Sequence, residues 1–316
     1  MSMIPNTKPG TMLQKTAVVA GLACLCNLLW GSAIPFINLG YQHFAIQSGD
    51  VPTLILFAGC RFFLAGLLTI LFVSIGRRKL VKPQGKGWRS AVKLAMVQTI
   101  GQYVFFYIGV ANTVSMNASI IQGLGPFVSI LIAALIFRTE TMGWAKWAGG
   151  LVGIAGILFV HIQPGSGALH LTFQGEGFLL ISMIASACSA VLIKRYGQQE
   201  DPVALSGWQF MLGGAVMALA GLTAGGRLSP DGPLAYGVLI YLAFLSAVAY
   251  TVWSLLLREN NVSRITVYIF LQPIFGVLLA WLFFGQQGTL PMWRYAAALL
   301  LVSCSILTVE KVSGRK

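Results

Sequence analysis

Side-chain amides supply much of the polar chemistry inside the apolar segments of this sequence. Gln98 and Gln102 are four residues apart, and Tyr103 follows directly, so the two amides share one face of a helix. Tyr268 and Gln272 repeat this spacing nearer the C-terminus. Because an amide is costly to bury without hydrogen bonds, we expect both faces to point inward, where they could bind a polar molecule.

Groups that usually carry catalysis are sparse. His43, His161 and His170 are scattered, without the spacing of a metal site. The five cysteines fall within apolar segments, where thiols behave as small hydrophobes, and the sequence has no nucleotide-binding loop of the Walker type. We therefore expect no enzyme activity, no catalytic residue, no metal site and no cofactor.

Composition indicates whether these residues lie in a soluble protein or in a membrane protein. Of the 316 residues, 57% are hydrophobic and 9% are charged, whereas soluble domains have roughly 25% charged residues. Apolar runs of about 20 residues, the length of a spanning helix, recur along the chain. We predict an all-α membrane protein with ten transmembrane helices, at residues 16–39, 51–74, 90–111, 116–137, 145–162, 175–195, 203–223, 234–257, 262–284 and 292–310.

The basic residues predict the orientation of these spans. All of the 21 Lys and Arg residues except Arg61, Arg227 and Arg294 fall at the termini or at alternate connections. The positive-inside rule then predicts that both termini are cytoplasmic in a multi-pass protein of the inner (plasma) membrane. The net charge of +13 is explained by orientation in a lipid bilayer, so we expect no nucleic-acid partner.

Two prolines lie at matching places in the two halves of the chain. Pro126 and Pro273 are 147 residues apart, and at an offset of 148 the segment GCRFFLAG (59–66) aligns with GWQFMLGG (207–214). Each half would hold five spans, an odd number, so the second half would cross the membrane in the opposite sense, as in the inverted repeats of secondary transporters. Proline costs roughly 3 kcal/mol inside a helix, so we predict hinges near a central site, or else simple bends of the two helices.

Four segments carry a family resemblance. NLLWGSAIPF in span one, CRFFLAGLL in span two and GPFVSILIAALIFRTETMGWAKWAGGLVGIAGILFV across spans four and five resemble an EamA-type repeat of the drug/metabolite transporter superfamily. LQPIFGVLLAWLFFGQQGTLPMWRYAAALLLVSCSILTV resembles the same part of a second repeat. The resemblance implies two inverted five-helix repeats around a central cavity lined mainly by spans 1, 3, 4, 6, 8 and 9. The expected divisions are a cytoplasmic N-terminal segment (1–15), a first repeat (16–163), a second repeat (174–310) and a cytoplasmic tail (311–316).

The family often has an acidic residue after the fourth span. Glu140 matches that residue, whereas Gln286 and Gln287 stand at the corresponding place in the second half. This departure from the family pattern leaves no acidic counterpart there.

Polar and aromatic residues of the implied lining spans are the candidate substrate-binding residues. Asn27 and Trp30 are three residues apart and share a helix face. Ser186 aligns with Trp30 at an offset of 156, although the stripe of Ser182, Ser186 and Ser189 is more typical of close helix packing. The full set is Asn27, Trp30, Gln98, Gln102, Tyr103, Gln122, Ser186, Tyr250, Trp253, Tyr268 and Gln272.

Arg61 lies ten residues into span two, close to the expected midplane. A charge there is costly and usually functional, so Arg61 either attracts an anionic group such as a carboxylate or ties helices together through exposed carbonyls. We favour the structural interpretation, since the resemblance implies that span two is peripheral. No carboxylate lies deep in a span, which disfavours an exporter of organic cations.

These features predict a secondary transporter that exports a small-molecule substrate, a neutral or zwitterionic metabolite such as an amino acid, by alternating access. The alternatives are a multidrug efflux carrier, a lipid-handling protein, a channel and a membrane enzyme. Gly149, Gly150, Gly153 and Gly156 in span five predict close helix contact, either within the protomer or in a homo-oligomer.

Overall fold

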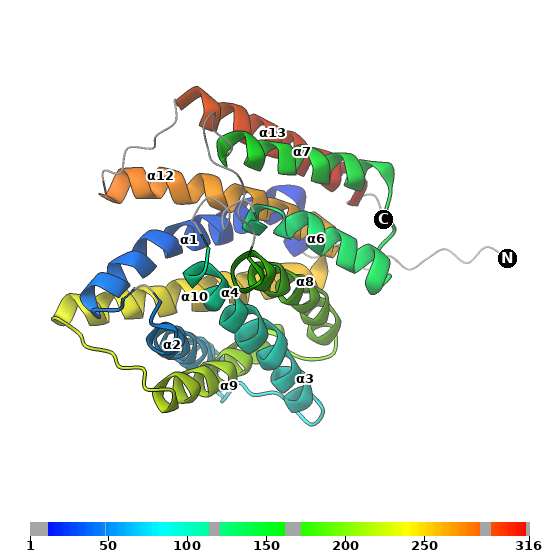
Figure 1. The fold of residues 1–316 in the computed structure, drawn as a ribbon. Coiled ribbons are helices and arrows are strands. Elements are labelled where there is room, and N and C mark those ends of the chain that lie inside the picture. Colours follow the sequence, from blue (N-terminus) through cyan, green and yellow to red (C-terminus); the bar gives the residue numbers. More distant parts are fainter. Residues whose placement is uncertain (1–11, 48, 114–120, 162–171, 285–291, 314–316) are drawn as a thin grey trace.

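The computed structural model describes residues 12–47, 49–113, 121–161, 172–284 and 292–313, and the regular structure in these residues is all helical (Figure 1). The first half contains η1 (Met12–Gln14), α1 (Thr16–His43), α2 (Val51–Arg77), α3 (Gly87–Leu94), the π-helix η2 (Ala95–Gly101), α4 (Gln102–Ala111), α6 (Gly125–Leu131), the π-helix η3 (Ile132–Ile136) and α7 (Trp144–His161). The second half contains the π-helix η4 (Phe173–Gly177), α8 (Phe178–Gly197), α9 (Pro202–Thr223), α10 (Pro233–Glu259), α11 (Val262–Thr266), the 3-10 helix η5 (Val267–Leu271), α12 (Gln272–Phe284) and α13 (Met292–Ser313).

Six helices of the described chain are long and apolar enough to cross a membrane. They are α1, α2, the segment Gly87–Val110, the segment Phe173–Gly197, α9 and α10, and shorter apolar helices cover Gly125–Ile136, Val262–Gly276 and Ala296–Val309. Helical structure is present within each of the ten ranges expected from the sequence, although the fourth is described only from residue 121 onward. The chain is therefore a multi-pass helical membrane protein.

Local sequence explains where two of the long helices begin. Asp50 caps α2 by accepting a hydrogen bond from the Thr53 backbone N–H at 3.2 Å, and Pro52 lies in its first turn. Asp201 caps α9 in the same way, accepting from the Val203 backbone N–H at 2.9 Å. A carboxylate at the cap and a proline in the first turn are both favourable at a helix N-terminus, where backbone N–H groups lack partners.

Helices α2 and α9 pack closely because glycines line their contact. A Cβ at Gly66 would meet the Gly207 carbonyl oxygen at 2.5 Å, and a Cβ at Gly214 would meet the Gly59 carbonyl oxygen at 2.8 Å. These four glycines belong to the two aligned segments 59–66 and 207–214. Small residues let two backbones approach within a membrane, so the aligned segments of the two halves pack against each other.

Helices α7 and α13 lie side by side at the opposite edge of the bundle from α2 and α9 (Figure 1). The Ser305 hydroxyl donates to the Gly149 carbonyl at 2.6 Å. A Cβ at Gly156 would lie 3.2 Å from Leu301 and from Val302, and the ring of Phe270 in η5 lies against Gly153. The glycine-rich face of span five thus packs inside the protomer.

Each of the two aligned prolines begins an α-helix. Pro126 lies in the first turn of α6, after a turn at Leu124, and Pro273 is the second residue of α12, directly after the 3-10 helix η5. In a first turn the missing N–H has no helical partner to lose, so the cost of a mid-helix proline does not arise. Both prolines therefore lie in the first turn of an α-helix that follows a local break, a turn before α6 and the 3-10 helix before α12.

Candidate functional site

An aromatic group forms where α1 meets α10. The ring of Trp30 in α1 lies 5.0 Å from the ring of Tyr250 and 4.9 Å from the ring of Trp253, measured between centroids. Tyr250 and Trp253 are three residues apart and so share one face of α10. All three side chains are buried, and edge-to-face or tilted contacts at this separation are favourable.

Tyr103 of α4 joins this group through its hydroxyl, which hydrogen-bonds the Tyr250 hydroxyl. The Phe62 ring lies 4.2 Å from Tyr103, and the Phe210 ring lies 4.7 Å from Tyr250. Phe62 and Phe210 also stack on each other, with centroids 5.4 Å apart. We call these residues, drawn from five helices, the aromatic cluster: Trp30, Phe62, Tyr103, Phe210, Tyr250 and Trp253.

Three polar side-chain atoms in this region have no hydrogen-bond partner among the described residues. They are the acceptor Oδ1 of Asn27, the donor Nε1 of Trp30 and the acceptor Oε1 of Gln102. Asn27 is fully buried, and its Nδ2 donates to the Ala23 carbonyl at 2.8 Å. Since an unsatisfied buried polar atom costs roughly 1–3 kcal/mol, a polar ligand that bonds these atoms would gain that free energy.

Gln98 has its partner in the protein. Its Oε1 accepts a hydrogen bond from Nε2 of Gln209 in α9 at 2.6 Å, and Oε1 of Gln209 accepts from the Thr99 hydroxyl at 3.2 Å. Gln98 lies within the π-helix η2, whose i→i+5 bonding widens the turn, so α-helical spacing no longer fixes one common face for Gln98 and Gln102. Gln98 thus bridges two helices.

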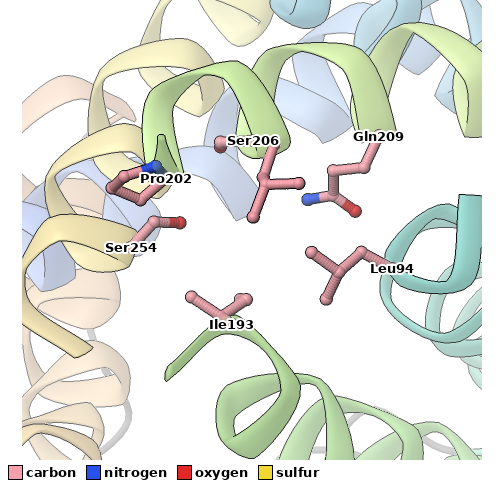
Figure 2. Close-up of a pocket in the computed structure, with 7 residues that line it drawn as sticks. Leu94, Ile193, Pro202, Ser206, Gln209 and Ser254 are labelled. Carbon is pink, nitrogen blue, oxygen red and sulfur yellow. The ribbon is translucent and has the colours of Figure 1, made fainter. Parts of the chain in front are cut away.

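Gln209 also lines a small recess between α3, α8, α9 and α10. Figure 2 shows its amide facing the recess together with Ser254, Leu94 and Ile193. The volume open to a water-sized sphere is about 0 Å³, so no substrate fits there in this conformation.

The remaining candidates lie on the helices around the aromatic cluster. Tyr268 is buried in η5 and belongs to the same hydrophobic core as Trp30. Gln272 and Gln122 are half-buried next to the two aligned prolines. Ser186 of α8 is half-buried, and its carbonyl accepts a hydrogen bond from the Ser189 hydroxyl at 2.7 Å, a contact within the helix.

Arg61 of α2 is 3% exposed and contacts α10. Its Nε donates to the Leu242 carbonyl at 3.3 Å and to the Ser246 hydroxyl at 3.2 Å, and its Nη2 donates to the same hydroxyl at 3.0 Å. It also donates to the Tyr107 hydroxyl and lies beside the ring of Phe62, 5.1 Å from its centroid. The guanidinium therefore adjoins the aromatic cluster.

A second group of polar residues lies at one end of the bundle. We call it the basic end; it carries η1 and the connections α2–α3, η3–α7, α8–α9 and α10–α11. Glu140 accepts a hydrogen bond from Lys146 Nζ at 2.7 Å, one from the Ser263 backbone N–H at 3.2 Å, and one from the Ser263 hydroxyl. The Glu140 and Lys146 side chains are 2% and 5% exposed. Burial raises the pKa of Glu140, but its hydrogen bonds with Lys146 and Ser263 lower the pKa by more than burial raises it. The pKa of Glu140 therefore lies below its ordinary value.

An open cleft of about 790 Å³ also lies at the basic end. Its charged residues include Arg77, which pairs with Asp201, and Arg258, whose Nε lies 2.8 Å from Glu259 Oε1. Ion pairs thus occupy both arginines of this cleft, whereas Trp30 of the aromatic cluster, Asn27 and Gln102 keep unsatisfied atoms.

The membrane helices and the buried polar and aromatic centre define a multi-pass helical membrane protein with polar groups inside its bundle. The sequence profile of the EamA-like transporter family matches the chain twice, over residues 18–162 and 173–309. The chain belongs to this family and is a membrane transporter of the drug/metabolite transporter type, with two EamA repeats.

Curated relatives are of the same kind. An uncharacterized transporter of Synechocystis, sll0355, is 25% identical over 92% of this chain and 90% of its own length. The uncharacterized inner membrane transporter YedA of Escherichia coli is 25% identical over 90% and 88% of the two chains. The chloroplastic WAT1-related protein At3g02690 of Arabidopsis thaliana is 25% identical over 78% of this chain and 60% of its own.

The fold has a solved counterpart. A crystal structure superposes with a TM-score of 0.77, covering 95% of this chain and 99% of that chain at 16% sequence identity. At that identity the likeness concerns the fold.

Proposed function

We propose that this chain is a secondary transporter that exports small neutral or zwitterionic metabolites, amino acids being the example we favour, by alternating access. The observation that carries the proposal is the aromatic cluster with its unsatisfied neighbours. Aromatic rings offer apolar contact and attraction for an ammonium group, while Asn27 Oδ1 and Trp30 Nε1 offer one acceptor and one donor. This chemistry suits a small molecule with both polar and apolar parts.

The proposed architecture is ten transmembrane helices in two inverted repeats. Contacts between aligned residues support it: Phe62 stacks on Phe210, its counterpart at an offset of 148, and Tyr103 bonds Tyr250, its counterpart at 147. Residues related by a two-fold axis meet each other on that axis. The aromatic cluster would then lie on the axis between the repeats, where substrate sites of inverted-repeat transporters occur.

We propose that the basic end faces the cytoplasm of a cell whose inner (plasma) membrane holds the protein, with both termini on that side. The basic residues at the termini and alternate connections support this orientation. The bond from Ser263 to Glu140 joins the two repeats there and, with the Glu140–Lys146 pair, would close the cytoplasmic entrance. Pro126 and Pro273 would act as hinges when this closure opens.

A multidrug efflux carrier is the second candidate, because six aromatic rings could also bind apolar drugs. The unsatisfied donor and acceptors favour a defined polar substrate over it, since a purely apolar ligand would leave them unbonded. A homo-oligomer, if one forms, would need a surface other than the glycine-rich face, which α6, η5 and α13 cover.

The experiment is a screen for ligands that stabilise the purified protein, followed by a transport assay on the ligands found. The purified protein is heated with each of the common amino acids and with a panel of apolar drugs, because a ligand of the folded state raises the melting temperature with ln(1 + [L]/Kd). Hits are tested for counterflow in proteoliposomes. We expect stabilisation and counterflow with one chemical group of amino acids. Stabilisation by unrelated drugs without any amino acid would replace the proposal by the multidrug carrier.

A further inference from the structure

We propose that the substrate carries a carboxylate and that Arg61 is its counter-ion. The inference rests on the proposed function and names the chemical class of the substrate. Among the described residues, the contacts of the Arg61 guanidinium are all neutral: the Leu242 carbonyl, the Ser246 and Tyr107 hydroxyls and the Phe62 ring.

No anion balances Arg61 in the part of the chain that the structure describes. The ion pairs found there join other residues and lie near the ends of the helices, namely Arg77 with Asp201, Lys146 with Glu140 and Arg258 with Glu259, and Asp231 hydrogen-bonds His43. A guanidinium that is 3% exposed within a membrane helix is costly unless an anion pairs with it. A ligand with a carboxylate would supply that anion.

The repeat provides an internal comparison. The counterpart of Arg61 at an offset of 148 is Gln209, and the counterpart of Ser246, at the offset of 147 that aligns Tyr103 with Tyr250, is Thr99. Gln209 bonds the Thr99 hydroxyl at 3.2 Å and the neighbouring Gln98 at 2.6 Å, just as Arg61 bonds the Ser246 hydroxyl at 3.0 Å. A neutral amide therefore makes the equivalent helix-to-helix bridge in the other half, and the bridge itself does not require a charge. The bridge therefore does not explain why residue 61 carries a positive charge.

Tyrosine hydroxyls connect Arg61 to the proposed site. Tyr107 bonds both Arg61 and Tyr41, and the charge of Arg61 also acts on Tyr103 and Tyr250, the hydroxyl pair of the aromatic cluster. A guanidinium binds a carboxylate through its planar fork of donors, and tyrosine hydroxyls can add hydrogen bonds. The carboxylate of an amino acid would face Arg61, while its ammonium group would face the rings of Trp30 and Trp253.

The first test compares ligands on the unaltered protein. Binding is measured by isothermal titration for each amino acid that stabilises the protein, and for its amide and its alcohol, which keep the ammonium and side chain but lack the carboxylate. We expect the amide and alcohol to bind at least about tenfold more weakly, the scale of a lost charge-assisted pair. Equal binding of acid and amide would overturn the inference while leaving the amino-acid transporter intact. Binding by none of them would overturn both.

The second test changes the arginine. Arg61→Gln gives α2 the same residue type that α9 has at the aligned position, Gln209, so we expect normal folded yield. The variant should bind the acid about tenfold or more weakly, and its binding of the amide should be unchanged. Arg61→Lys should retain part of the affinity for the acid. Arg227→Gln, which removes the same charge from an exposed position, is the matched control and should bind the acid normally. Undiminished acid binding by Arg61→Gln would overturn the inference. Should that variant fail to fold, the acid-to-amide comparison decides alone.

Discussion

Gln98 and Gln209 satisfy each other inside the bundle, which separates them from the candidate residues with unsatisfied atoms. Gln98 Oε1 is the acceptor for Gln209 Nε2, and both side chains are almost fully buried. Gln102, four residues after Gln98, keeps an unbonded Oε1 among the described residues. Two glutamines four residues apart therefore differ in bonding: Gln98 bridges two helices, and Gln102 keeps a free acceptor among the described residues.

We predict that Gln98→Leu lowers the free energy of unfolding by about 1–3 kcal/mol, because the Gln209 amide loses its acceptor in a buried place. The double variant Gln98→Leu, Gln209→Leu should recover part of that loss, since it removes the stranded donor as well. Unfolding of the purified variants in detergent measures both values. Additive losses in the double variant would show that the two amides do not interact.

The sequence singled out part of the aromatic cluster. Trp30, Tyr103, Tyr250 and Trp253 follow from polar or aromatic side chains at helical spacing, and the structure brings these four together. Phe62, Phe210 and Gln209 were missed. Phe and Leu look alike in an apolar run, and only the alignment of the two halves at 148 marks these positions as counterparts.

At the scale of elements, the glycine-rich face of α7 fixes how the fifth span packs. We predict that Gly153→Leu reduces folded yield and lowers stability by several kcal/mol, because the Phe270 ring occupies the space a side chain would need. Gly21→Leu is the control, since no other group lies within 4 Å of a Cβ there. Size-exclusion chromatography and thermal unfolding of both variants measure the effect. Equal stability of the two variants would contradict the packing.

Six of the ten expected spans match helices that are long and apolar enough to cross a membrane, and they could be predicted because composition and length nearly determine such a span. Changes of helix type within a span could not be predicted from the sequence. The π-helix at Ala95–Gly101 and the 3-10 helix at Val267–Leu271 depend on tertiary contacts, and neither has a local sequence signal. Pro126 and Pro273 did indicate where two α-helices begin, although the sequence alone suggested breaks within longer helices.

At the scale of the whole molecule, Glu140 ties the first half to α11 of the second. We predict that Glu140→Gln lowers stability at neutral pH by about 3 kcal/mol, because Lys146 is left buried without its anion. The pKa of Glu140 in the folded protein lies below its ordinary value of 4.5. Its stabilisation is therefore present above pH 4.5 and is lost as the pH falls through the folded value.

Melting temperature measured between pH 7 and pH 3 tests this prediction. The unaltered protein should lose stability on acidification below pH 4.5, and Glu140→Gln should lose less over the same range. Parallel curves for the two proteins would mean that this carboxylate does not hold the two halves together.

Trp30→Phe tests whether the substrate binds at the aromatic cluster. The change keeps an aromatic ring but removes Nε1, a donor with no partner among the described residues. The measurement is the Kd of the amino acid that stabilises the protein most, with its counterflow rate in proteoliposomes. Trp208→Phe is the matched control, because Trp208 Nε1 donates to the Val81 carbonyl at 2.9 Å and lies outside the cluster. We predict that Trp30→Phe weakens binding by about 1 kcal/mol, roughly fivefold, while Trp208→Phe loses stability and binds normally. Normal binding and counterflow by Trp30→Phe would contradict the account.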